Sequence, residues 1–89
     1  MAHTLRSIVK QATLLMAEVT ELEPVEVTGV ARDEKGWSLR MEMLEYKKIP
    51  PAGDVIAEYA VQLDAEGELL SFQRVRSRLR SETVTGEGV

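Results

Sequence analysis

Hydrophobic residues at the start of the chain recur every three or four positions, which is the spacing of a helix with one apolar side. The residues that follow this spacing are Leu5, Ile8, Val9, Ala12, Leu15, Met16, Val19 and Leu22. Thr4 is expected to cap the helix, because its hydroxyl can accept a hydrogen bond from a free backbone amide. Pro24 cannot continue the helix. The pattern therefore predicts a helix from Leu5 to about Leu22, which needs an apolar surface to cover.

After Pro24 the pattern changes to an alternation of apolar and polar residues, which is typical of β-strands with one buried face. Four strands are predicted, at residues 25–32, 37–46, 55–64 and from about 69 to 80. On the second strand, Trp37, Met41 and Met43 share the apolar side, so we expect them to fill the core. The methionines have an alternative interpretation as an adaptable binding surface.

Turn residues separate these strands. Residues 33–36 and 64–67 have the composition of hairpin turns, and Gly67 suits the positive φ of such a turn. Pro50 and Pro51 lack the amide donor of a sheet ladder, so residues 47–54 are predicted to form a loop. Gly29 indicates a β-bulge, and the irregular alternation at residues 44–46 predicts either a bulge or the end of the strand.

Such short connections favour antiparallel strands, because parallel strands need long crossovers. The predicted fold class is α+β, with an N-terminal amphipathic helix packed on one face of a four-stranded antiparallel β-meander. Residues 1–82 are expected to form this single small domain, and residues 83–89 a flexible C-terminal tail.

The composition of the 89 residues is ordinary for a soluble chain, with 44% hydrophobic residues, 29% charged residues and no cysteine. The N-terminal segment does not have the pattern of a signal peptide, and no run of residues is apolar enough to span a membrane. We therefore expect a cytoplasmic protein. The net charge of −4 is unevenly distributed, since residues 70–89 carry 4 Arg against 2 Glu while the remainder is acidic.

Candidate catalytic groups are scarce in this sequence. The single histidine, His3, lies at the terminus, and no motif of a nucleophile, a phosphate loop or a metal site occurs. Glu18, Glu21 and Glu23 are close together but lack an oxygen-rich loop, so we interpret them as a solvated helix face. We predict no catalytic, cofactor-binding or metal-binding residue, and therefore no enzyme.

The last predicted strand carries an arginine at every second position, at Arg74, Arg76, Arg78 and Arg80. In a strand these side chains would project from one face, together with Phe72, and neighbouring strands would present Glu42 and Glu58 to them. One interpretation is a ladder of cross-strand ion pairs, each worth roughly 0.2–1 kcal/mol when exposed.

Three other interpretations remain open. The row could be a docking surface for an acidic partner, because arginine binds carboxylates with two parallel hydrogen bonds. Nucleic acid is disfavoured, since the row lacks interleaved aromatic residues and the chain is acidic. A helical segment would instead place Arg74 and Arg78 one turn apart.

Residues across most of the chain together resemble the gas vesicle protein O family. The resemblance is carried by "GWSLRMEMLE", by Ile49 and Pro50, and by "DVIAEYAVQLDAEGELLSFQRVR", and it covers about residues 5–80. Phe72 and Leu79 stand where the family usually has tyrosine, and these 89 residues do not include the long acidic or low-complexity N-terminal extension that family members often carry. The segment "YAVQLDAEGELL" also resembles half of a PepSY-type repeat.

The resemblance implies a non-enzymatic accessory protein that is required for gas vesicle assembly and needs no cofactor. Its expected partners are other gas vesicle proteins, including accessory proteins and the shell subunit, with a location in the cytoplasm or on the vesicle. Pairing of two copies through an edge strand is a further option. The residues expected to contact partners are Arg74, Arg76, Arg78, Arg80, Glu42 and Glu58. The alternative function is a small PepSY-like inhibitor or ligand-binding module.

Overall fold

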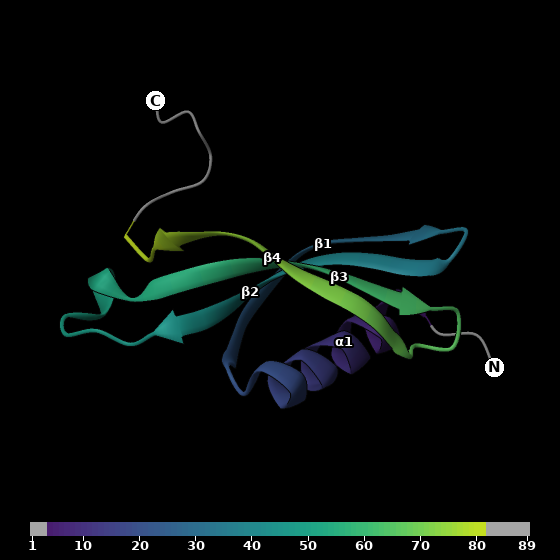
Figure 1. The fold of residues 1–89 in the computed structure, drawn as a ribbon, viewed down its shortest axis with the longest axis horizontal. Helices are drawn as coiled ribbons and strands as arrows, with labels where there is room; N and C mark the ends of the chain where they lie inside the picture. The colour runs from purple at the N-terminus through teal and green to yellow at the C-terminus, as the bar shows by residue number, and fades with distance from the viewer. Residues whose placement is uncertain (1–3, 82–89) are drawn as a thin grey trace, which may run out of the picture.

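A computed structural model describes residues 4–81 and confirms the predicted α+β class (Figure 1). One helix is followed by four strands, with a short 3₁₀ helix between the second strand and the third. The elements are α1 (Leu5–Thr20), β1 (Glu23–Asp33), β2 (Gly36–Tyr46), η1 (Pro51–Gly53), β3 (Val55–Asp64) and β4 (Leu69–Leu79). His3 and the predicted tail at residues 83–89 lie outside the described residues.

Helix α1 begins at Leu5, with Thr4 as its N-cap, as predicted. The Thr4 hydroxyl accepts a hydrogen bond from the backbone N–H of Ser7 at 3.1 Å, and the Ser7 hydroxyl accepts one from the backbone N–H of Thr4 at 3.0 Å. The predicted end at Leu22 is wrong by two residues. Glu21 adopts a left-handed backbone conformation with φ 59°, and its N–H donates to the carbonyl of Ala17 at 2.9 Å, so the helix ends at Thr20.

The four strands form one antiparallel sheet in the order β1-β2-β3-β4. Each hairpin turn is held by an aspartate. Asp33 accepts hydrogen bonds from the backbone amides of Lys35 and Gly36, and Asp64 accepts them from the amides of Glu66 and Glu68. Gly67 has the predicted positive φ, at 87°. These connections are too short for any arrangement but a meander.

Extra residues interrupt the ladder at several positions. The predicted bulges appear as register shifts between Val27 and Gly29 and between Leu44 and Tyr46. Strand β4 contains two further bulges that the sequence did not predict. Its partner residues Glu58 and Tyr59 pair with Arg76 and Arg74, so Val75 is inserted between them, and a second shift leaves Leu70 inserted.

The inserted Val75 corrects the predicted arrangement of the arginine row. Arg76 pairs with Glu58 but Arg74 pairs with Tyr59, and consecutive residues of β3 point to opposite faces. Arg74 therefore lies on the face of the sheet that carries Tyr59, not on the face of Arg76. Phe72 also lies on the tyrosine side, where its ring centroid is 6.1 Å from that of Tyr59. The expectation that Phe72 and all four arginines share one face is wrong.

The core lies between α1 and the apolar face of β2 and β3. Trp37, Met41 and Met43 are buried in it, which confirms their predicted role as core residues. The buried members of this cluster are Ile8, Ala12, Met16, Trp37, Leu39, Met41, Met43, Ala57, Tyr59, Val61 and Leu63. Their alternation along each strand is the pattern that identified the strands in the sequence.

Helix α1 covers the sheet on one side and only over part of its length. Figure 1 shows α1 beneath the sheet, whereas the end of β2, η1, the start of β3 and the end of β4 extend beyond the helix on the left. The opposite side of the sheet carries no helix among the described residues. This arrangement leaves a full sheet face and one end of the other face open to contacts.

Candidate functional site

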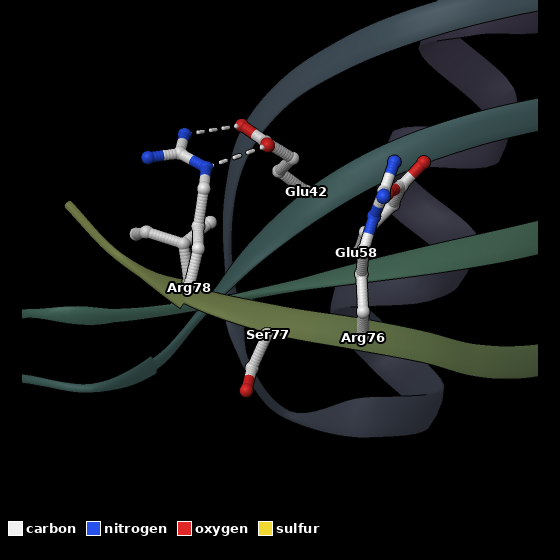
Figure 2. Close-up of a pocket in the computed structure, with 6 residues that line it drawn as sticks. Glu42, Glu58, Arg76, Ser77 and Arg78 are labelled. Carbon is white, nitrogen blue, oxygen red and sulfur yellow. Dashed lines mark hydrogen bonds and ion pairs between the residues drawn. The ribbon is translucent and has the colours of Figure 1, made fainter. Parts of the chain in front are cut away.

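The open side of the sheet carries a set of charged residues that we call the charged face. Its members are Arg40, Glu42, Glu58, Arg76 and Arg78. The register places them together, because Glu42 pairs with Glu58 on β3 and Glu58 pairs with Arg76 on β4. Figure 2 shows Arg76 and Arg78 pointing to this side of β4 and Ser77 pointing to the other. The predicted proximity of Glu42 and Glu58 to the arginines is therefore present.

Glu58 lies at the centre of this face and binds two arginines. Its Oε1 accepts a hydrogen bond from Nε of Arg76 at 2.6 Å, and its Oε2 accepts one from Nη1 of Arg40 at 3.2 Å. The hydrogen bond from Arg76 is the largest cause that lowers the pKa of Glu58, and the bond from Arg40 adds to it. Partial burial of the carboxylate opposes this shift. Glu58 therefore remains ionised at neutral pH and holds both guanidinium groups in place.

Arg78 and Glu42 form a second pair that crosses over β3. Nε and Nη2 of Arg78 donate to the two carboxylate oxygens of Glu42 at 3.2 and 3.0 Å (Figure 2). Glu42 is buried, with 7% of its surface exposed. The same residues and Arg76 line a small hollow over Ile56, which is 1% exposed although it is outside the core under α1. The aliphatic parts of the arginines thus cover an apolar residue on an otherwise charged face.

Arg80 binds Asp54 at the end of the sheet. Its Nε donates to Oδ2 of Asp54 at 3.1 Å, and the backbone amide of Lys48 donates to Oδ1 at 2.8 Å. The backbone amide of Arg80 also donates to the carbonyl of Asp54 at 2.7 Å. The hydrogen bond from Lys48 is the largest cause that lowers the pKa of Asp54, and Arg80 adds to it against burial. Asp54 therefore fastens the loop at residues 47–54 to the end of β4.

Arg74 binds Glu45 on the helix side of the sheet. Its Nη2 and Nε donate to the two oxygens of Glu45 at 2.7 and 2.8 Å. The side-chain hydrogen bond is the main cause of a lowered pKa at Glu45 and of a raised pKa at Arg74. Each of the four arginines in the row therefore has a carboxylate partner within the chain.

Sequence reasoning missed three members of this network, which are Arg40, Glu45 and Asp54. The sequence did contain a signal for Arg40, because it alternates with Glu42 on the polar side of β2. Glu45 is paired through two bulges and Asp54 through a loop, so no spacing in the sequence indicates either contact.

The chemistry available to this site is that of ion pairs and hydrogen bonds. Within residues 4–81, no group of three His, Cys, Asp or Glu side chains could hold a metal ion. No helix in that range is both long and apolar enough to cross a membrane. Arg76 is 66% exposed and binds Glu58 through Nε, which leaves its terminal nitrogens to donate to a further acceptor.

Comparisons with known proteins give a consistent result. The family model of gas vesicle synthesis protein GvpO matches residues 2–83. Gas vesicle protein O of Streptomyces sp. (strain CB03234) is 39% identical over 69 residues, which are 78% of this chain and 54% of that protein. The chain thus spans about half the length of this curated relative. No solved structure matches the chain.

Proposed function

Because the chain belongs to the family of gas vesicle synthesis protein GvpO, we propose that it is an accessory protein required for gas vesicle formation. It acts in the cytoplasm or on the growing vesicle through contacts with other gas vesicle proteins, and it catalyses no reaction. The family match over residues 2–83 is the observation that carries this proposal. The match includes the segment that resembles a PepSY-type repeat, so the inhibitor alternative has no observation of its own.

The charged face supports the part of the proposal that concerns protein contacts. Arg76 and Arg40 are 66% and 51% exposed and share Glu58, so each keeps donors that an acidic partner could occupy. Arginine is favoured at protein interfaces because its planar group binds carboxylates with two parallel hydrogen bonds. In this role Glu42 and Glu58 orient the guanidinium groups, and a carboxylate of the partner adds to them.

The contact is centred on Arg76, with Arg40 and Arg78 beside it. Arg80 extends the row to the end of the sheet, and Arg74 contributes from the other face through the pair with Glu45. This division follows from the bulge at Val75. It predicts that the arginines of the row contribute unequally to binding, with Arg76 first and Arg74 last.

The test of vesicle function is deletion of the gene in its host, followed by complementation. Cells without the protein should contain no gas vesicles by electron microscopy, and the restored gene should return them. Normal vesicles in the deleted strain would show that the protein is dispensable for their formation.

The test of the contact surface is co-purification of vesicle proteins with tagged variants. Arg40→Gln/Arg76→Gln should lose the acidic partner, and Lys10→Gln/Lys35→Gln is the control that removes two exposed charges elsewhere. Glu58→Gln breaks the same ion pairs but keeps both guanidinium groups, so it should keep a larger share of the partner. If these three variants recover equal amounts of the partner, the ion pairs of the charged face stabilise the folded chain and do not bind a partner.

A further inference from the structure

Basic residues are concentrated at one end of the sheet. Residues 44–56 and 74–81, which we call the projecting end, carry 6 Lys and Arg against 2 Asp and Glu. The remainder of residues 4–81 carries 5 Lys and Arg against 11 Asp and Glu. The projecting end is the part of the sheet that extends beyond α1 in Figure 1. Four of these basic residues are the arginines paired with Glu45, Glu58, Glu42 and Asp54, so the positive charge that remains at the projecting end comes from Lys47 and Lys48 in its loop.

The projecting end also displays large apolar side chains. Ile49 is 99% exposed at the tip of the loop, Tyr46 is 61% exposed, and Val75 and Leu79 are more than two-fifths exposed. The loop that presents Ile49 is fixed to β4 through Asp54, with the backbone amide of Ser81 also donating to the carbonyl of Ala52 at 3.1 Å. Exposed apolar residues on a held loop are typical of a contact surface.

The outer surface of α1 has the complementary chemistry. Leu14 is 61% exposed, and with Gln11, Leu15, Ala17 and Glu18 it lines a shallow hollow on the helix. Glu18 on the helix and Glu21 directly after it are exposed and make the C-terminal end of α1 acidic, whereas the exposed charges of its first half are Arg6 and Lys10. One copy of the chain therefore carries both a basic apolar surface and an acidic apolar surface, at different places.

We infer that two copies of this chain associate face to face, with the projecting end of each copy bound to the outer surface of α1 of the other. In each copy, α1 of the second copy then packs on the end of the sheet face that its own α1 leaves uncovered. The two contacts are equivalent and related by a two-fold axis, so the assembly closes as a dimer and does not grow into a filament. Lys47 and Lys48 of one copy meet Glu18 and Glu21 of the other, and Ile49 contacts the side of Leu14.

This dimer leaves the charged face free on both copies, because that face is on the opposite side of the sheet. Self-association is therefore independent of the contacts proposed above for other vesicle proteins. The attraction between the two ends is electrostatic in part, and salt screens exposed charges over a Debye length of about 10 Å at 0.1 M. Raised ionic strength should thus weaken the dimer.

Sedimentation equilibrium of the purified chain measures this association directly. One copy has a mass of 9.9 kDa, and the wild type should reach twice that mass as its concentration rises. Lys48→Glu and Glu18→Lys should each weaken the dimer by about tenfold or more, because each places like charges together in both contacts. Lys35→Glu and Glu34→Lys make the same charge reversals in the exposed turn between β1 and β2, and should leave the dimer unchanged.

A mixture of the two weakened variants gives the sharpest result. In a dimer of one Lys48→Glu copy and one Glu18→Lys copy, both contacts again join opposite charges, so the 1:1 mixture should recover the wild-type mass. Ile49→Ser should also weaken the dimer without affecting the fold, since Ile49 is almost fully exposed in the single chain. A wild type that stays monomeric at every concentration overturns the inference. The inference is also overturned if Lys48→Glu and Glu18→Lys leave the dimer unchanged, or if their mixture does not recover the wild-type mass.

Discussion

Arg74 of β4 and Glu45 of β2 form a two-point ion pair that crosses over β3, with N–O distances of 2.7 and 2.8 Å. Arg76 is two positions further along the same strand and binds Glu58 on the opposite face of the sheet. The row of arginines is therefore divided between two faces. Arg74 fastens β4 to β2 on the helix side of the sheet, and Arg76 and Arg78 bind Glu58 and Glu42 on the charged face.

Replacement of Glu45 by Gln should lower the urea midpoint of unfolding. The substitution removes the negative charge that Nε and Nη2 of Arg74 bind, and it leaves this arginine without its carboxylate near Tyr46 and Tyr59. Glu34→Gln removes an equivalent charge from an exposed turn residue and is the control. The role assigned to the pair would be wrong if the two variants unfolded at the same urea concentration.

Stability should fall as the solution is acidified. The folded-state pKa values of Glu45, Glu58 and Asp54 lie below the ordinary values of 4.5 for Glu and 3.8 for Asp. The unfolded chain therefore takes up protons first as the pH falls, which favours unfolding. The contribution of these groups is complete above about pH 4.5 and is lost progressively below it. Urea unfolding at neutral pH and at about pH 3 measures the loss, which should be smaller in Glu45→Gln.

Gly36 should not tolerate a side chain. Its φ is 146°, and an added Cβ would collide with the carbonyl oxygen of Leu63 and the backbone of Asp64. We expect Gly36→Ala to lower the free energy of unfolding by more than about 1 kcal/mol. Gly29→Ala is the matched control, because its Cβ would meet only the Cβ of Arg40 at 3.9 Å. Equal thermal midpoints for the two alanine variants would contradict the geometry of this turn.

Truncation of the core should be far more costly than truncation of the outer helix surface. Met41 is fully buried, so Met41→Ala leaves a cavity and should cost about 2–5 kcal/mol of unfolding free energy. A domain of this size has only a few kcal/mol of stability, so the variant should be largely unfolded at room temperature by circular dichroism. Leu14→Ala removes a side chain that is 61% exposed and should remain folded.

The helix and the four strands could be predicted because each has one face in the same core. Trp37, Met41 and Met43 alternate with polar residues on β2, and this alternation is what burial on one side requires. The turns were equally readable, because Asp and Gly at fixed offsets satisfy the backbone of tight hairpins. Glu21 gave no such signal, since a glutamate in the left-handed conformation has no sequence signature.

The distribution of the arginines could not be predicted, because one inserted residue reverses the face of everything before it. No residue type in "FQRVRSRLR" identifies Val75 as the insertion. The pairing of Arg74 with Glu45 also depends on the combined register of three strands, which only the assembled sheet defines. The sequence indicated the charges of the site and the partners Glu42 and Glu58, but it did not indicate Glu45 or Asp54.

The most direct measurement is a count of gas vesicles by electron microscopy in cells that carry Arg40→Gln/Arg76→Gln in place of the wild-type gene. Lys10→Gln/Lys35→Gln is the parallel control, and immunoblotting confirms equal amounts of the two proteins. If the charged face assembles vesicles through protein contacts, the first strain should contain few or none and the second a normal number. Normal vesicles in both strains, at equal protein levels, would contradict the proposal.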